Sequence, residues 1–190
     1  MRIAVIGTGN IGGTLGSRWS GAGHDVVYGS RAGSGAGPAG APQRPVAEAI
    51  DGADVVVLAV PGGAVADVIG GHGAALAGKV IIDATNSMGG AEYNSRAAIS
   101  AAAPDARYVR AFNTLGWENF ADPLPGTQLF FAADPPARQA AEDLIAAVGL
   151  EPVFVGDADA TTIVDGLLPL WFTLVRQYGG NRKLAFRVIR

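Results

Sequence analysis

The chain alternates short apolar runs, rich in valine and isoleucine, with alanine-rich stretches of helical period. The apolar runs lie at residues 3–6, 26–28, 55–60, 80–82, 108–109, 129–131 and 153–155. They are continuous rather than alternating with polar residues, which is typical of strands covered on both faces. The pattern predicts an α/β fold of the Rossmann type, with a doubly wound, mostly parallel sheet and a small C-terminal helical extension.

The clearest helical pattern runs from Pro135 to Val148. Asp134 stands in the N-cap position, proline occupies the first turn, and Gly149 follows the last apolar residue. These residues are the usual start and stop signals of a helix.

A last long helix is expected from Ala160 to Tyr178, with a kink at Pro169. One apolar face carries Ile163, Leu167, Trp171, Leu174 and Tyr178, and Val164, Leu168 and Val175 widen it. Because one sheet edge is too small to cover such a broad face, we expect the Trp171 face to form the interface of a homodimer.

The segment 32–45 breaks the alternation. It is rich in glycine, alanine and proline and has no hydrophobic period. We therefore expect a mobile loop in place of a crossover helix.

Composition narrows the class of protein. The chain has 190 residues, of which 49% are hydrophobic and 16% charged, with a net charge of −3. This suits one domain without the basic surface that nucleic acid or an anionic membrane requires. With no cysteine and two isolated histidines, no metal site is expected. No apolar run approaches the length of a membrane span, and no targeting segment is recognisable, so we expect a cytoplasmic protein.

A glycine motif follows the first strand and opens a helix. Gly7, Gly9 and Gly12 occupy the three positions of G-x-G-x-x-G. The first allows a tight turn, the second lets the backbone approach a pyrophosphate, and the third lets the helix pack closely on the strand. The helix N-terminus adds amide donors for phosphate, so the motif predicts a dinucleotide site.

The end of the second strand selects the dinucleotide. Chains that bind NAD usually carry an acid here for the ribose hydroxyls, whereas this chain has Ser30 and Arg31. A hydroxyl and a guanidinium bind a 2′-phosphate that an acid would repel, which predicts NADP(H). Arg44 is a second candidate for the same phosphate.

Three further segments follow predicted strands at the same edge of the sheet, where ligands bind in such folds. They are Ala59-Val60-Pro61, the stretch that contains Asn86, and the stretch Val109–Trp117 with its polar pair Asn113 and Thr114. Asn113 either contacts a nicotinamide ring or only satisfies backbone groups of its loop.

No acid–base set is apparent. The sequence offers no Ser/His/Asp set, no Cys/His pair and no carboxylate pair, and Asp83 is expected only to cap a turn. This absence suits hydride transfer between two flat cofactors, which depends on stacking and alignment more than on an acid or base.

The motifs resemble those of the NADPH-dependent coenzyme F-420 reductases, which pass hydride between NADPH and a 5-deazaflavin. The similar stretches are "IGTGNIG", "VVYGSR", "VVVLAVP", "VRAFNTLG" and "VGDADATTIVDGLLPLWFTLV". The resemblance implies a pyrophosphate loop at Thr8, Gly9, Asn10 and Ile11, and a 2′-phosphate site at Ser30 and Arg31.

The resemblance also reaches the acceptor end. It places Asn113 and Leu115 around the facing nicotinamide and deazaflavin rings, as candidates for catalysis through ring positioning, and Trp117 near the carboxamide. Well-studied members carry histidine at the position of Asn113, and a longer, charged helix in place of the 32–45 segment.

The expected activity is hydride transfer between NADPH and coenzyme F-420 or a similar acceptor, in a single domain of residues 1–190. Residues 1–115 would form the dinucleotide-binding core, and residues 116–190 would complete the acceptor pocket and the dimer face. One alternative is an NADPH-dependent imine or carbonyl reductase, with Tyr93, Tyr108 or Asp83 as proton donor. Another is a non-catalytic NADP(H) sensor that binds a partner protein.

Overall fold

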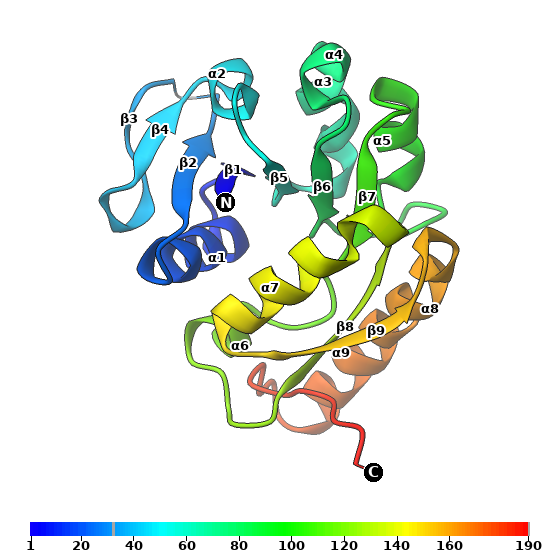
Figure 1. Ribbon diagram of the computed structural model, residues 1–190. Helices are drawn as coiled ribbons and strands as arrows, with labels where there is room; N and C mark the ends of the chain where they lie inside the picture. The colour runs from blue at the N-terminus through cyan, green and yellow to red at the C-terminus, as the bar shows by residue number, and fades with distance from the viewer. Residues whose placement is uncertain (32, 190) are drawn as a thin grey trace.

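The computed structural model describes residues 1–31 and 33–189, and nine strands in this part of the chain form one sheet (Figure 1). The strand order is β3-β4-β2-β1-β5-β6-β7-β8-β9. All neighbouring pairs are parallel except β3–β4 and β7–β8, so the predicted mostly parallel α/β fold is confirmed. The strands are β1 Arg2–Ile6, β2 Asp25–Gly29, β3 Gly35–Ala36, β4 Pro42–Arg44, β5 Val55–Leu58, β6 Val80–Asp83, β7 Arg107–Arg110, β8 Gln128–Ala133 and β9 Glu151–Gly156.

Helices cover both faces of the sheet (Figure 1). Side chains of β1 alternate between the two layers: Ile3 and Val5 belong to one buried cluster, and Ala4 and Ile6 to the other. This burial on both sides explains the unbroken apolar runs of the sequence. The first layer contains α1 Asn10–Gly21, α6 Glu118–Ala121 and α7 Arg138–Val148, and the second contains α2 Val46–Ile50, α3 Val65–Ile69, α4 Gly73–Leu76 and α5 Arg96–Ala102.

The helix expected from residue 135 to 148 is present as a 3₁₀ turn, Pro135–Ala137, followed by α7. Gly149 ends it with a φ of +94°, in the left-handed region that glycine adopts at low cost. Asp134 precedes the turn, but its carboxylate accepts the backbone N–H of Tyr108 at 2.7 Å instead of capping the helix. The helix start therefore also ties β7 in place.

The expectation of a loop over residues 32–45 is wrong for its described residues, 33–45. These residues form β3, a 3₁₀ turn at Pro38–Gly40 and β4, and β4 pairs in parallel with β2. Gly37 permits the arrangement, because a Cβ there would stand 2.6 Å from the ring of Tyr28. Strands of two and three residues carry no detectable period, which is why the pattern missed them.

The long C-terminal helical run consists of a 3₁₀ turn, Ala158–Ala160, then α8 Thr161–Asp165 and α9 Leu167–Gln177. Its division at Gly166 agrees with Pro169, which has no N–H for the carbonyl of Asp165. The burial is not the one expected: Trp171 is 2% exposed, while Ile163 and Leu170 are 64% and 47% exposed. Trp171 is therefore a core residue, and the dimer face assigned to it is wrong.

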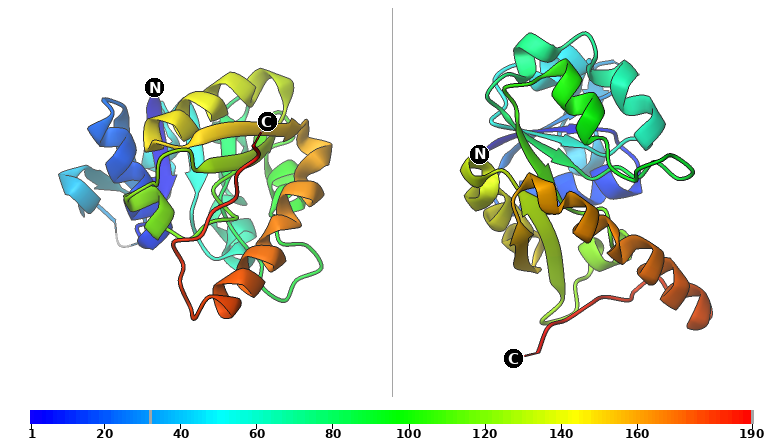
Figure 2. Two further views of the ribbon diagram at one scale, coloured as in Figure 1. Left: turned by 90° about the horizontal axis from the view of Figure 1, so that it is seen from below. Right: turned by 90° about the vertical axis from the view of Figure 1, so that its right-hand side faces the viewer.

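The C-terminal tail covers the indole of Trp171. In Figure 2 the tail leaves the end of α9 and returns beside it towards β8. The indole N–H of Trp171 donates to the carbonyl of Leu184 at 2.9 Å, and Asn119 Nδ2 donates to the carbonyl of Arg182 at 2.9 Å. The chain itself thus buries part of the face that we expected a second copy to cover.

One helical run also corrects the expectation about membrane spans. Ala158–Gln177 has 20 residues and a mean hydropathy of 1.2, which matches a span in length and composition. Within an 18-residue stretch of this run, 44% of the residues are buried. Val164, Leu168 and Trp171 pack inside the chain, as in the core helix of a globular protein.

Candidate active site at the carboxyl edge of the sheet

The site begins where β1 and β5 lie side by side. From β1 the chain passes to β2 on one side of it and later returns to β5 on the other side, from which the sheet grows towards β6. The strand order therefore reverses direction between β1 and β5, and this is the switch point of the sheet. Ligands of doubly wound folds bind in the crevice outside the strand ends at such a point. Gly7 and Ala59 follow the two strands and are in contact there.

The three glycines of the loop differ in what surrounds them. Gly7 has a φ of +113°, and a Cβ would lie 2.5 Å from the carbonyl oxygen of Ala59. A Cβ on Gly12 would lie 2.2 Å from the carbonyl oxygen of Gly7. Gly9 meets nothing within 4 Å, so its missing side chain leaves open space directly before the first turn of α1. A helix N-terminus with such open space before it has the shape and the amide donors that a phosphate group requires.

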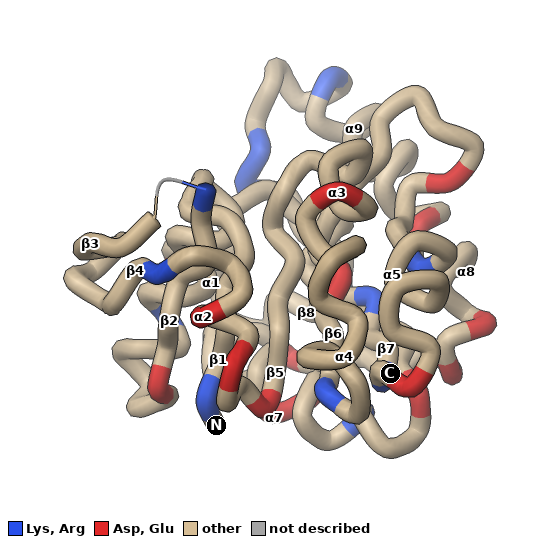
Figure 3. The backbone as a smooth tube through the Cα atoms, turned by 90° about the horizontal axis from the view of Figure 1, so that it is seen from above, with Lys and Arg blue, Asp and Glu red and all other residues tan. Residues whose placement is uncertain are grey.

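Beside the loop lies a cavity of about 560 Å³, within the size range of ligand pockets. It is lined by Ile6, Gly7, Thr8, Gly29, Ser30, Arg31, Gln43, Val46 and Val60. Among the described residues of this lining, Arg31 is the one that carries a charge, so the cavity favours an anion at that end. Charged positions of both signs are spread over the molecule, and basic ones lie beside the end of β2 and in β4 (Figure 3).

The two candidates for the phosphate differ in position. Arg31 lines the cavity, whereas Arg44 lines a different one together with Arg2 and Asp25. The backbone of Arg44 does contribute, because its carbonyl accepts the N–H of Ser30 at 3.0 Å. Gln43 and Val46 also line the cavity. Sequence reasoning missed Gln43 because it treated residues 32–45 as a loop, and it gave no role to Val46.

Asn86 and Asn113 meet at the ends of β6 and β7. Asn86 Nδ2 donates to the backbone carbonyl of Asn113 at 2.8 Å. Asn113 and Leu115 are buried, and Trp117, at the start of α6, is half-buried against the core. The structure thus joins Asn86 to Asn113. Leu115 and Trp117 instead pack into the buried cluster on the face of the sheet that α1 covers.

Phe112 holds Asn113 in a strained turn. Its φ of +63° is unfavourable for a bulky residue. The ring is locked edge-on between Trp19 and Phe120, with both centroids 5.6 Å away. Strain of this kind persists where the surroundings over-determine it, often at functional sites.

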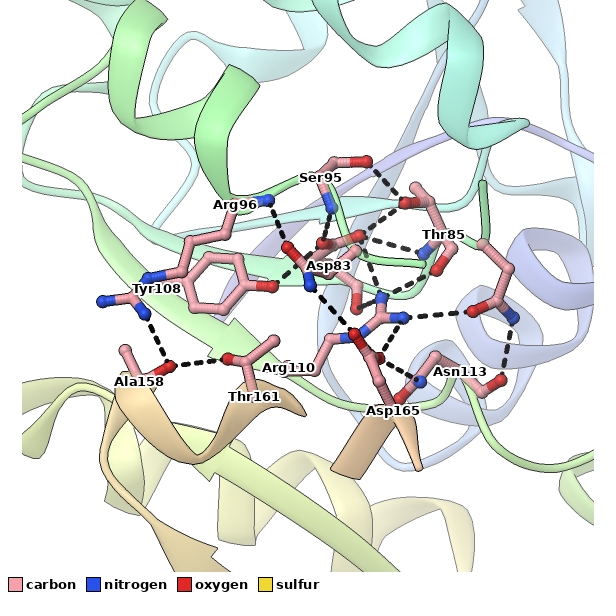
Figure 4. A network of polar contacts seen from close by, with 12 residues as sticks. Asp83, Thr85, Ser95, Arg96, Tyr108, Arg110, Asn113, Ala158, Thr161 and Asp165 are labelled. Carbon is pink, nitrogen blue, oxygen red and sulfur yellow. Dashed lines mark hydrogen bonds and ion pairs between the residues drawn. The ribbon is translucent and has the colours of Figure 1, made fainter. Parts of the chain in front are cut away.

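Sequence reasoning missed a buried polar network behind the two asparagines (Figure 4). Arg110, at the end of β7, is 0% exposed and pairs with Asp165 of α8 at 2.6 Å and with Asp83 of β6 at 3.3 Å. The structure therefore contains the carboxylate pair that the sequence did not reveal. Two features of the sequence could have indicated this network: Arg110 stands between apolar residues in "YVRAF", and Asp165 stands inside an apolar helix.

Asp83 does more than cap a turn. It accepts hydrogen bonds from the N–H and hydroxyl of Thr85, from the N–H of Ser95 and from the hydroxyl of Tyr108. Burial raises the pKa of the Tyr108 phenol well above its usual range, and the adjacent Asp83 charge adds to the shift. Tyr108 therefore keeps its proton and directs it at Asp83.

A second cavity of about 210 Å³ lies on the other side of Asp165. It is lined by Ala91, Glu92, Tyr93, Asn94, Thr162, Asp165 and Gly166. Asn94 Nδ2 donates to Asp165 Oδ2 at 2.9 Å, so Asp165 links this cavity to the buried network. Of the proton donors considered from the sequence, Tyr93 lines the cavity, whereas Tyr108 and Asp83 are engaged with each other.

Known proteins share this fold and part of this sequence. The family model described as NADP oxidoreductase, coenzyme F-420-dependent, matches residues 2–87. A protein from Arthrobacter sp. FB24, provisionally described as an F-420-dependent NADP reductase, has a TM-score of 0.86 at 24% identity, with 100% of both chains covered. A hypothetical protein from Sinorhizobium meliloti has a TM-score of 0.75 at 25% identity, covering 100% of this chain and 96% of that one.

An imine reductase from Streptomyces aurantiacus has a TM-score of 0.69 at 18% identity, covering 92% of this chain and 61% of its own length. This similarity shows the fold alone. The match to the family model bears on the glycine loop and on the β2 end, which lie inside residues 2–87. Over these residues the chain is similar to the NADP oxidoreductases described as coenzyme F-420-dependent, and this similarity supports an NADP-dependent oxidoreductase.

Proposed function

We propose that the protein transfers hydride between NADPH and a deazaflavin, coenzyme F-420, or an acceptor of similar shape. The observation that carries the proposal is a 560 Å³ cavity with one guanidinium, continuous with the glycine loop at the switch point. The family match over residues 2–87 supports the same cofactor and, through its description, the same acceptor.

The residues present fit NADP(H). The open space at Gly9 and the first turn of α1 suit the pyrophosphate, with Thr8, Asn10 and Ile11 forming the rest of the loop. Ser30 and Arg31 at the end of β2 suit the 2′-phosphate. Gly7 and Gly12 allow the close packing that holds the loop against β5.

The nicotinamide end would lie over the ends of β5 and β6. Ala59, Val60 and Pro61 follow β5, and Asn86 follows β6. Reduced nicotinamide supplies a hydride when NADPH is bound. The part of this chain is to hold the ring and to exclude water, through Asn86 and the segment Asn113–Trp117.

The direct test mixes the protein with NADPH and oxidised coenzyme F-420 and follows the deazaflavin absorbance. We expect stoichiometric NADPH binding and catalytic turnover, both lost in Gly9→Val. Binding without turnover by any acceptor tried would instead favour the alternative of a non-catalytic NADP(H) sensor.

One observation favours a second candidate function, the reduction of imines or carbonyl compounds. Tyr93 lines the 210 Å³ cavity beside the buried network, where a small substrate could take up a proton from its phenol. Turnover of NADPH with small cyclic imines, but not with coenzyme F-420, would support this function. Its dependence on Tyr93 would then identify the donor.

We also propose a cytoplasmic homodimer that acts on a small molecule and not on nucleic acid or a membrane. The exposed side of the helical run, with Ile163, Leu170 and Tyr178, replaces Trp171 as the contact surface. In the proposed division, residues 1–115 bind the dinucleotide and residues 116–190 complete the acceptor pocket, in part through Asp165.

A further inference from the structure

Arg110 uses all three nitrogens of its guanidinium inside the protein. Nε donates to Asp165 Oδ1 at 2.7 Å, and Nη1 donates to the carbonyls of Asp83 and Thr85 at 3.1 and 2.7 Å. Nη2 donates to Asn86 Oδ1 at 3.0 Å and lies 2.6 Å from Asp165 Oδ1. Four hydrogen bonds and two ion pairs therefore hold the planar fork, an arrangement that the compact ammonium group of a lysine cannot reproduce.

This arrangement fixes how the amide of Asn86 is turned. Its oxygen accepts from Arg110, so its Nδ2 faces the backbone carbonyl of Asn113. The end of β6 is thereby joined to the strained turn that follows β7.

The amide of Asn113 is fixed from the other side. Asp165 receives hydrogen bonds from Arg110, from Asn94 and, at 3.1 Å, from Asn113 Nδ2. Arg110 can only donate, and the oxygen of Asn94 already accepts the N–H of Arg96, so Asp165 acts as an acceptor towards both and the nitrogen of Asn113 faces it. The Asn113 side-chain oxygen is then left buried, without a hydrogen-bond partner in the described chain.

We propose that Arg110 and Asp165 are positioning residues for the nicotinamide end of the site. They hold Asn113 so that its side-chain oxygen accepts an N–H of the nicotinamide carboxamide. The inference rests on the proposed NADP(H) binding. β6 lies two strands from β1, or about 10 Å, so a dinucleotide with its pyrophosphate at Gly9 brings its ring to the ends of β6 and β7.

The burial of the acceptor matters for this contact. Asn113 is 3% exposed, so bulk water does not satisfy its oxygen. A ligand donor reaches the oxygen only where the covering side chains yield, and the contact therefore forms with the bound ring and not with solvent. An unpaired buried acceptor therefore strengthens the binding of a ligand that brings a matching donor and weakens the binding of a ligand that lacks one.

The test compares NADP⁺ with its 3-acetylpyridine analogue, in which a methyl ketone replaces the carboxamide and no N–H remains. Dissociation constants are measured by calorimetry for wild type and for Asn113→Leu. We expect wild type to bind the analogue about tenfold more weakly than NADP⁺, and Asn113→Leu to bind both within about twofold. The same ratio of constants in both proteins would overturn the contact.

A second pair of variants tests the positioning. In Asp165→Asn an amide faces Asn113, whose side chain can then turn either way, so we expect the discrimination to fall to about threefold or less. Asp83 still pairs with Arg110 in this variant, and a melting curve checks that it is folded. The control Asn94→Ala removes the other amide contact of Asp165 and should keep the tenfold ratio. Full discrimination in a folded Asp165→Asn would contradict the role of Asp165.

Arg110→Lys completes the series. Lysine keeps the charge but cannot reach Asn86 and Asp165 together, so we expect it to lose the discrimination as Asp165→Asn does. None of these measurements contains an acceptor. Failure of turnover with coenzyme F-420 would therefore count against the proposed function only, and a flat ratio with normal turnover would count against this inference only.

Discussion

Arg110 at the end of β7 and Asp165 in α8 form an ion pair, with 2.6 Å between Nη2 and Oδ1. Their side chains are 0% and 7% exposed. Asp83 lies 3.3 Å from the same guanidinium, so two buried carboxylates share one positive charge. In such an arrangement the single cation is the indispensable member, because its loss leaves two like charges away from water.

Arg110→Met should therefore lower the free energy of unfolding by about 3–5 kcal/mol. Asp165→Asn should lower it by about 1–2 kcal/mol, since Asp83 still balances the guanidinium. Urea unfolding of the variants measures both effects. Asp159→Ala, which removes the exposed partner of Arg96, serves as the control and should cost less than about 1 kcal/mol. Equal losses in Arg110→Met and Asp165→Asn would contradict the shared-charge description.

Gly9 and Gly12 should separate binding from folding. Gly9→Val places its side chain in open space, so the protein should keep its melting temperature and lose dinucleotide binding. Gly12→Val drives a side chain into the carbonyl of Gly7, and this variant should be strongly destabilised. Calorimetric titration with NADPH and thermal melting distinguish the two. Near wild-type NADPH affinity in Gly9→Val would disprove the phosphate-loop assignment.

Features that depend on local sequence were predictable. The strands of the parallel sheet appear as apolar runs because both faces are buried, and the glycine loop appears because Gly7 and Gly12 meet steric limits set by nearby backbone. The place of Arg31 at the end of the second strand was enough to propose it as a phosphate ligand, and the structure puts it in the lining of the 560 Å³ cavity.

Features that depend on distant contacts were not predictable. Asp83, Arg110 and Asp165 are separated by 27 and 55 residues, and only the sheet order and α8 bring them together. The burial of Trp171 likewise depends on the tail at Leu184, which carries no periodic signal. The hydrophobic pattern of a helix identifies its apolar face but does not identify which segment of the chain covers that face.

Tyr108 should make the stability of the protein sensitive to alkaline pH. Its pKa is raised in the folded chain, so the folded state holds the proton after an unfolded tyrosine, near pH 10, begins to lose it. This contribution is complete below about pH 10 and is lost as the pH rises towards the folded pKa. Chemical unfolding from pH 8 to 11 should show a steeper fall for wild type than for Tyr108→Phe. Parallel curves would mean that the phenol does not titrate with unfolding.

The exposed side of the C-terminal helical run should carry the proposed dimer contact. Ile163, Leu170 and Tyr178 are 64%, 47% and 63% exposed on this run. Leu170→Glu should convert a dimer into a folded monomer in light scattering, because it places a charge in an apolar contact. Trp171→Glu should unfold the protein instead, since that indole is buried. A monomeric wild type at micromolar concentration would disprove the dimer.

Arg31 should carry most of the preference for NADPH over NADH. Within the described part of the chain it is the one charged residue that lines the 560 Å³ cavity, and a charge-assisted contact to phosphate contributes about 1.5–3 kcal/mol. Arg31→Ala should therefore weaken NADPH binding roughly 10- to 100-fold and leave NADH binding nearly unchanged, because NADH has no 2′-phosphate. Ser30→Ala should act in the same direction but less strongly. Arg44→Ala is the matched control, because Arg44 lines a different cavity, and both affinities should stay near wild type. The measurement is a pair of dissociation constants at matched salt for each protein. Equal losses of NADPH and NADH affinity in Arg31→Ala would show that Arg31 supports the fold or the adenine instead of the phosphate.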